Sequence, residues 1–275
     1  ILRNNYNLSK METLNTNPFF RCKTDNAFRV KIMTEIVSNV LKTSFWEIGP
    51  LGIKLSMFDD SRKTMITIEL KAENFQYYSY SGNDSIHIGI NSSHFHKMLK
   101  SIKKKDNIEL QIDEHTSNEL QITAIPLAQN RKTTSHIKIQ TVQNLEVVNP
   151  CGYGSSIIIP SVDFQKMIKD LHAINSDKIS IHTQNGMINF SSDADGIMKR
   201  TVSFGEYDER DKTVTSDIFS TEQIQRISKI SALYENIHIF PSTKTLPIQF
   251  KTNVGSIGEL CIFIKSDENI NRETE

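Results

Sequence analysis

The sequence has little cysteine and no long apolar run. Its three cysteines, Cys22, Cys151 and Cys261, lie far apart and form no C-x-x-C spacing, so neither a cysteine-ligated metal nor a disulfide framework is predicted. Apolar runs such as Ile157-Ile158-Ile159 are far too short to cross a bilayer. No basic-then-apolar leader opens the chain. We therefore expect reduced thiols, no secretion and no membrane partner.

An excess of either charge is also missing, because 32 basic residues balance 32 acidic residues. Proteins that hold nucleic acid tightly are usually basic overall, since neutralising phosphates supplies much of their affinity. The balance therefore argues against tight, direct nucleic-acid binding. It leaves open a positive charge that is segregated onto one surface.

Motifs for nucleotide or metal chemistry are incomplete. Gly152-Tyr153-Gly154 lacks the Gly-Lys-Ser/Thr of a phosphate-binding loop. His94-x-His96 places its two rings on opposite sides of a helix. Asp193-x-Asp195-Gly196 resembles the start of a calcium loop, but the twelfth position is Phe204 and not Glu. We expect no metal and no cofactor.

The loop after Met57 raises a sharper question, since Phe58 precedes two carboxylates, Asp59 and Asp60. Nothing local would tune either carboxylate for acid–base work, and turns favour Asp in any case. No Ser-His-Asp or Cys-His arrangement can be assembled either. We expect a protein without enzymatic activity, in which the two carboxylates shape and solvate the loop.

The chain contains an internal repeat of helix, strand, Gly turn and strand, which predicts an α+β fold of two similar domains with two helices and many antiparallel strands each. Asn185-Gly186 between alternating runs is a strong hairpin signal, and Ser220-x-x-Gln223 is typical of a capping box. The predicted helices are 26–43, 92–104, 162–173 and 220–233. The predicted domains are an N-terminal extension (1–18), an N-terminal domain (19–139), a connector (140–155), a C-terminal domain (156–266) and a frayed tail (267–275).

Basic residues outnumber acidic ones on the polar faces of the four helices taken together. Since the whole chain is neutral, we predict a polarised surface. If the helices share one side of the sheets, they form a basic strip that contacts phosphates without reading sequence.

The residues match a known pattern along nearly the whole chain, from about Phe20 to Lys265. The most specific part is Trp46-x-Ile48, Gly52-Ile53-x-Leu55 and Phe58-Asp59-x-Ser61. Further matches are Asn91-x-Ser93, Lys97, Lys100, Pro160-Ser161, Phe164, Lys166, Lys169, Asp170, Leu171, Gly186, Pro247, Gly258 and the 260–264 strand. On these residues the chain resembles DNA polymerase sliding clamps of the proliferating cell nuclear antigen (PCNA) family.

The resemblance implies the DNA-clamp fold, in which two-domain subunits trimerise head-to-tail into a ring around duplex DNA. Such a processivity factor tethers DNA polymerase and other replication and DNA repair proteins, and is placed on DNA by a clamp loader. The inner-surface positions correspond to Lys31, Lys97, Lys100, Lys132, Lys166, Lys169 and Lys229. Ser38 and Glu222 stand where relatives often have a basic side chain. We therefore expect some of the DNA contacts inside the ring to be made by Lys42 and Arg226 instead.

The resemblance also implies two protein interfaces. A homotrimer would join the edge strand 133–139 of one subunit to 196–203 of the next, through His136, Ile137, Ile139, Ile197, Lys199 and Thr201. Partner peptides of the PIP-box type place one aliphatic and two aromatic residues in an outer pocket. Its walls would be Phe58, Arg62, Met65, Val147, Pro150, Pro247, Phe263 and Ile264.

Three alternatives stay open on the sequence alone. Within the fold, the chain could be a subunit of a checkpoint-type heterotrimeric clamp. Outside that assembly it could be a monomeric processivity factor that holds DNA by a basic face, or an enzyme. The Asn-, Ile- and Lys-rich composition is typical of the AT-rich genomes of some protists and large DNA viruses. We expect a nuclear protein, or one of a cytoplasmic replication factory if it is viral.

Overall fold

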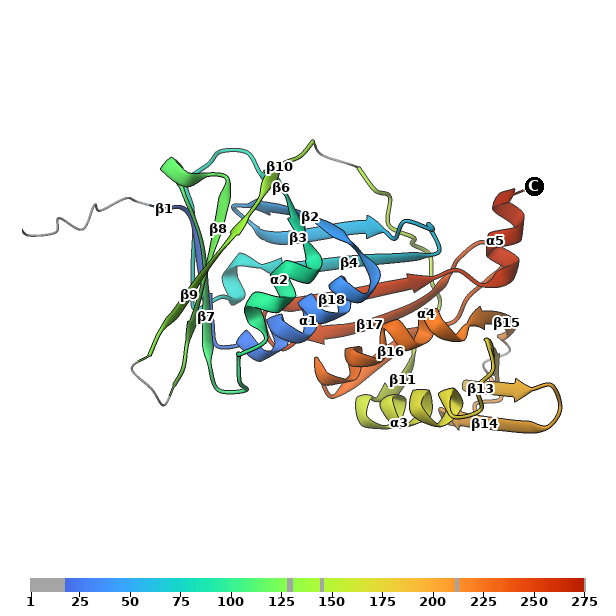
Figure 1. The fold of residues 1–275 in the computed structure, drawn as a ribbon. Coiled ribbons are helices and arrows are strands. Elements are labelled where there is room, and N and C mark those ends of the chain that lie inside the picture. The colour runs from blue at the N-terminus through green and yellow to red at the C-terminus, as the bar shows by residue number, and fades with distance from the viewer. Residues whose placement is uncertain (1–17, 128–130, 144–145, 211–212, 275) are drawn as a thin grey trace, which may run out of the picture.

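The computed structural model describes residues 18–127, 131–143, 146–210 and 213–274. Apart from Pro18, the predicted N-terminal extension lies outside them. The described residues form three antiparallel sheets with helices packed on them (Figure 1). One core runs through both halves of the chain, from Phe20 to Ile264.

The sheets contain five, nine and four strands. The five-stranded sheet runs in the order β5 (Tyr77–Tyr80), β1 (Pro18–Thr24), β7 (Asn107–Asp113), β8 (Glu119–Ile125), β9 (Thr133–Lys138). The nine-stranded sheet runs β10 (Gln140–Thr141), β6 (Ile86–Asn91), β2 (Thr43–Gly49), β3 (Gly52–Phe58), β4 (Thr64–Lys71), β18 (Gly258–Ile264), β17 (Ile248–Val254), β16 (Asn236–Phe240), β11 (Ile157–Pro160). The four-stranded sheet runs β14 (Met198–Phe204), β13 (Met187–Ala194), β12 (Lys178–Gln184), β15 (Val214–Ser220).

The nine-stranded sheet crosses from one half of the chain to the other. Its junction is the antiparallel pair β4 and β18, in which Met65 lies opposite Phe263 and Ile68 opposite Leu260. Buried residues alternate along β4, with Ile66, Ile68 and Leu70 facing the core. The two predicted halves therefore share one continuous sheet.

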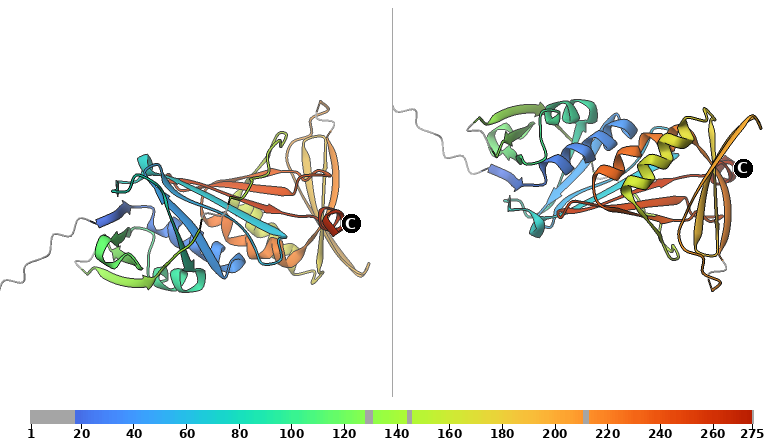
Figure 2. Two further views of the ribbon diagram at one scale, coloured as in Figure 1. Left: turned by 90° about the horizontal axis from the view of Figure 1, so that it is seen from above. Right: turned by 90° about the horizontal axis from the view of Figure 1, so that it is seen from below.

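Four helices lie on one face of the sheets, as the view from below in Figure 2 shows. They are α1 (Ala27–Val40), α2 (Ser92–Leu99), α3 (Ser161–His172) and α4 (Thr221–Arg226), with short 3₁₀ segments at Ala72–Asn74 (η1), Glu114–Thr116 (η2) and Ser228–Ala232 (η3). Helix α1 packs against α2, α4 and η3, and α3 packs against α4 and η3. The four helices therefore share one side of the sheets, which is the arrangement that a basic strip requires.

All four helices end before the predicted residue, α1 and α3 by three residues or fewer and α2 and α4 by five or more. Helix α2 stops at Leu99, and the Asp106 carboxylate then accepts the backbone N–H of Lys103, 2.8 Å away, which fixes a turn. The predicted 220–233 helix is broken into α4 and η3. Ser220 makes no side-chain capping bond, so the predicted capping box is not formed.

Local turn chemistry agrees better with the sequence. Asn185 and Gly186 have φ angles of 52° and 77°, and β12 and β13 pair directly across them, which confirms the predicted hairpin. The predicted frayed tail is different: 267–274 form a helix, α5 (Asp267–Thr274), whose Asn269 is buried. Its anchoring depends on contacts with a loop more than twenty residues away, which local polarity could not reveal.

Candidate functional site

The predicted hole residues divide into paired and unpaired cations. Lys97 and Lys169 are exposed and make no ion pair among the described residues, and exposed Lys132 directly precedes β9. Lys166 pairs with Asp163 at 3.3 Å, and Lys229 pairs with Glu35 at 3.5 Å. The basic excess on this face is therefore smaller than the count of lysines suggests.

Three other basic residues that were predicted to contact DNA bind groups of this chain instead: Lys31, Lys42 and Arg226. The ammonium group of Lys31 donates to the carbonyl of Lys100 at 2.7 Å and to that of Ile102 at 3.0 Å, so it holds the end of α2. Lys42 follows α1 and pairs with Asp60 at 2.8 Å, and Arg226 pairs with Glu222 on its own helix. Lys100 keeps an exposed side chain.

The two predicted interface strands are both edge strands. Strand β9 borders only β8, and β14 borders only β13. Of the six predicted interface side chains, His136, Ile197, Lys199 and Thr201 are exposed, and Ile197 retains 83% of its surface. Ile137 and Ile139 are 7% and 5% exposed and belong to the core, so their side chains are not available to a neighbour.

The predicted peptide pocket is a groove of about 640 Å³. It is lined by six of the eight predicted residues: Phe58, Arg62, Met65, Pro150, Pro247 and Phe263. Ile264 is fully buried in the main core, because it follows Phe263 in β18 and so faces the other side of the sheet. Val147 lines an adjoining groove of about 600 Å³. In the groove of about 640 Å³, the connector valine is Val148.

Phe58 is presented by a loop that Asp59 organises. The Asp59 carboxylate is 5% exposed and accepts the hydroxyl of Ser61 at 2.6 Å and two backbone N–H groups of the loop. Arg62 is held at a φ of 57°, and its guanidinium carbon lies 5.2 Å from the centroid of the Phe58 ring. Asp59 is thus a structural anchor, as expected, and Phe58 is a half-exposed apolar side chain beside it.

Tyr153 fixes the connector beside this groove, although the sequence pattern did not predict this role. Its hydroxyl donates to the carbonyl of Pro247 at 2.8 Å, and its ring lies 5.8 Å from Phe240 and 6.2 Å from Phe263 between centroids. Burial raises the pKa of the Tyr153 hydroxyl, which stays neutral. The sequence did contain a sign of this role, because a single aromatic residue in a polar connector needs an apolar surface to pack against.

The suspected calcium-loop motif acts as a turn, and His94 and His96 lie in helix α2. The Asp193 carboxylate accepts the N–H of Gly196 at 2.7 Å, and Asp195 and Gly196 have φ angles of 51° and 77°. Among the described residues no group of three or more His, Cys, Asp and Glu side chains could hold a metal ion. In the same part of the chain, no helix is long and apolar enough to span a bilayer.

Comparisons with known proteins agree on one family. Residues 19–147 match the family model described as "Proliferating cell nuclear antigen, N-terminal domain". The chain is 22% identical over 254 residues to the "Probable DNA polymerase sliding clamp 1" of Paramecium bursaria Chlorella virus 1, covering 89% of this chain and 95% of that protein. It is 26% identical over 249 residues to the "DNA polymerase sliding clamp" of Nitrosopumilus maritimus, covering 86% of this chain and 95% of that protein.

The fold is shared with a solved structure. The crystal structure of PCNA from Entamoeba histolytica superposes with a TM-score of 0.79 at 17% identity, covering 91% of this chain and 99% of that chain. The family is non-enzymatic, and its partners are DNA and DNA polymerase. The α+β clamp fold, the family model and relatives aligned over most of their length lead to one conclusion: the chain is a divergent member of the PCNA family of DNA polymerase sliding clamps.

Proposed function

We propose that three copies of this chain close head-to-tail into a ring around duplex DNA, which tethers a polymerase through the groove at Phe58. The observation that carries this proposal is the matching of sheet edges. The five-stranded sheet ends in β9 and the four-stranded sheet in β14, at opposite ends of the molecule (Figure 1).

Pairing β9 of one subunit with β14 of the next would give a sheet of nine strands. The nine-stranded sheet within the chain has the same composition, five strands from the first half and four from the second. Unpaired edge strands present a row of free backbone donors and acceptors that favours such addition. The contact is heterologous, because it joins two different surfaces of identical subunits. Such contacts give a closed ring when the rotation from one subunit to the next returns to the first. Exposed Ile197 and Met198, 83% and 50%, would be covered in it.

In that ring the helices α1 to α4 line the hole, since they share one face of the sheets (Figure 2). The exposed lysines Lys97, Lys100, Lys132 and Lys169, together with paired Lys166 and Lys229, supply sequence-independent phosphate contacts. Because topology retains the ring, these contacts stay weak enough for sliding. The outer groove takes PIP-box-type peptides of polymerase, clamp loader and repair proteins, in the nucleus or in a cytoplasmic replication factory.

Mass measurement in solution tests the assembly. Light scattering of the purified chain at micromolar concentration is expected to give three times the mass of one chain. Ile197→Asp is expected to give a monomer that keeps its fold, because a charge would enter the covered edge. Leu51→Asp is the matched control, since Leu51 is 79% exposed in the β2–β3 turn, away from β9 and β14.

A persistent monomer of the unaltered chain would contradict the ring and favour a monomeric processivity factor. A ring that forms only after addition of other clamp subunits would point instead to a heterotrimeric clamp.

A further inference from the structure

The groove beside Phe58 combines an apolar floor with a rim whose charged side chains are all basic. Its described lining includes five cations, Arg62, Lys63, Lys244, Lys265 and Arg272, and no acidic residue. The chain as a whole is neutral, so this excess is local. We infer that this groove selects partner peptides whose apolar anchors are flanked by Asp and Glu side chains.

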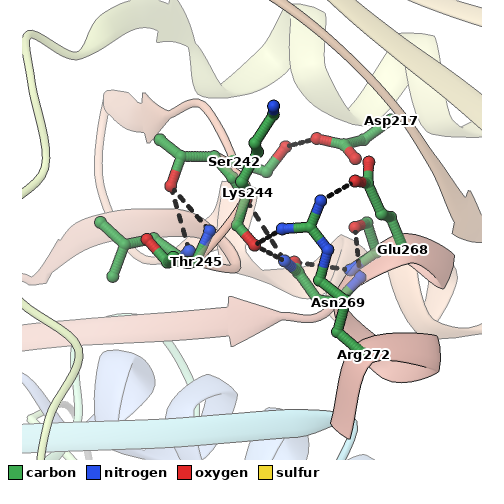
Figure 3. Close-up of polar contacts among 10 residues, drawn as sticks. Asp217, Ser242, Lys244, Thr245, Glu268, Asn269 and Arg272 are labelled. Carbon is green, nitrogen blue, oxygen red and sulfur yellow. Dashed lines mark hydrogen bonds and ion pairs between the residues drawn. The ribbon is translucent and has the colours of Figure 1, made fainter. Parts of the chain in front are cut away.

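Helix α5 builds one side of this rim (Figure 3). The side-chain amide of Asn269 donates to the carbonyls of Thr243 and Lys244, at 3.2 and 3.3 Å, and Arg272 donates to the Lys244 carbonyl at 2.7 Å. Ser266 accepts the backbone N–H of Asn269 at 3.2 Å and caps the helix. The helix therefore fixes the loop that carries Lys244 and places Arg272 beside it.

The second side of the rim comes from the β3–β4 loop and from Lys265, which follows β18 and whose N–H donates to the Lys63 carbonyl at 2.9 Å. The cationic groups of Arg62 and Lys265 lie 5.2 and 5.6 Å from the centroid of the Phe58 ring, so the aromatic anchor of the groove is flanked by positive charge. The Asp59 carboxylate of the same loop is buried and committed to backbone donors. It is not among the residues that line the groove.

Nearby carboxylates leave most of the rim unneutralised. Glu268 pairs with Arg272, Asp267 with Lys178 and Asp60 with Lys42. Arg62, Lys63 and Lys244 are exposed and make no ion pair among the described residues. An acidic side chain entering the groove would therefore find unpaired cations on two sides of the apolar floor.

The floor argues for a peptide and against DNA as the occupant. Phe58, Val148 and Leu246 offer an apolar surface beside the buried side chains of Met65 and Phe263, and phosphates and sugars would leave that surface uncovered. An apolar patch with a polar rim is the usual anatomy of a protein-binding site. Complementary charge on the partner would speed encounter and disfavour basic peptides.

A series of synthetic peptides tests the inference, which rests on the proposed docking function of this groove. Three fluorescent peptides carry the same aliphatic and two aromatic anchors, flanked by Asp/Glu, by Gln/Ser or by Lys/Arg. The full chain is expected to bind the acidic peptide about tenfold more tightly than the neutral one, as a few exposed ion pairs allow. The difference should shrink in about 0.5 M salt, which screens exposed charges.

Charge-reversal variants assign the preference to the rim. Lys244→Glu and Arg272→Glu are each expected to reduce the preference by about threefold or more, while Lys71→Glu, at the far end of β4, keeps it. If Arg272→Glu loosens α5, Lys244→Glu still tests the inference. Lys244 binds Asn269 and Arg272 of α5 only through its backbone carbonyl, which the substitution keeps.

The outcomes separate the two proposals. Equal affinity for the three peptides, or tighter binding of the basic one, would overturn the acidic preference and leave the docking groove standing. Binding of none would overturn the groove and the preference together. Displacement of the acidic peptide by a short DNA duplex would assign the rim to DNA and also overturn the inference.

Discussion

Asp59 and Thr64 are joined by two hydrogen bonds that run in opposite directions. The Asp59 N–H donates to the Thr64 carbonyl at 2.8 Å, and the Thr64 N–H donates to the Asp59 carboxylate at 2.9 Å. The same carboxylate oxygen accepts the N–H of Lys63 at 2.8 Å. This closed loop leaves Phe58 half-exposed at its base, so Asp59, which the sequence pairs with Asp60 like a catalytic carboxylate, serves to display an aromatic ring.

Replacing Asp59 should destabilise the protein and weaken peptide binding. Asp59→Ala leaves the buried N–H of Thr64 without its side-chain acceptor, and we expect a loss of about 2 kcal/mol in the free energy of unfolding. Urea denaturation measures it. The control is Asp60→Ala, which removes only an exposed pair with Lys42 and should change stability by less than about 0.5 kcal/mol. Equal effects of the two variants would show that Asp59 has no special structural role.

Replacing Phe58 should separate docking from assembly. Phe58→Ala removes the aromatic wall of the groove, and we expect about a thirtyfold loss of peptide affinity and weaker polymerase stimulation, as for a binding hot spot. The trimer mass should not change, because Phe58 lies away from β9 and β14. Tyr77→Ala, which removes another exposed aromatic, is the control. Unchanged peptide affinity in a titration of Phe58→Ala would refute the docking site.

Unpaired lysines of the helical face should matter more for DNA than paired ones. Lys97→Ala and Lys169→Ala each remove an exposed cation that has no ion-pair partner in the described chain. Each variant that removes one phosphate interaction should reduce the slope of log affinity against log salt by about 0.9. Lys166→Ala should have a smaller effect, because its charge is already paired with Asp163. DNA titrations at several salt concentrations measure the slopes, and identical slopes in all variants would exclude these interactions.

His96 should make stability depend on pH. It lies in α2 near Glu35 of α1, and its Nδ1 is buried with no hydrogen-bond partner among the described residues. Burial lowers its pKa despite the nearby Glu35 carboxylate. The charge of Lys100 lowers the pKa further, whereas a hydrogen bond with the backbone of Lys31 raises it by more than the Lys31 charge lowers it. The unfolded chain then binds a proton that the folded chain does not, between the lowered pKa and the ordinary value of about 6.5. The stability contributed by neutral His96 is present above about pH 6.5 and is lost as the pH falls below it.

Denaturation at about pH 7 and about pH 5.5, on the two sides of the ordinary histidine pKa, measures this dependence. The loss of stability on acidification should be smaller in His96→Gln than in the unaltered chain. His94→Gln, an exposed histidine of the same helix, should keep the full loss. The same loss in His96→Gln as in the unaltered chain would exclude His96 as its source.

The sequence by itself determined the local elements and the family. Hydrophobic periodicity placed the four helices, and Asn185-Gly186 specified its hairpin because only left-handed backbone fits that turn. The spacing of Trp46, Gly52 and Phe58 carried the resemblance that the comparisons confirm. Six of the eight residues that the resemblance assigned to the peptide pocket line the groove.

Only the tertiary structure decided which side chains are available. Ile137, Ile139 and Ile264 are buried because the pleat turns them to the core, and a shift of one residue in a strand reverses that direction. Pairing of Lys229 with Glu35 and of Lys42 with Asp60 depends on carboxylates that folding brings close, whereas Lys166 pairs with Asp163 on its own helix. The same holds for α5: its polar sequence predicts a loose tail, and its Asn269 becomes buried only because the 243–245 loop supplies the carbonyls that it binds.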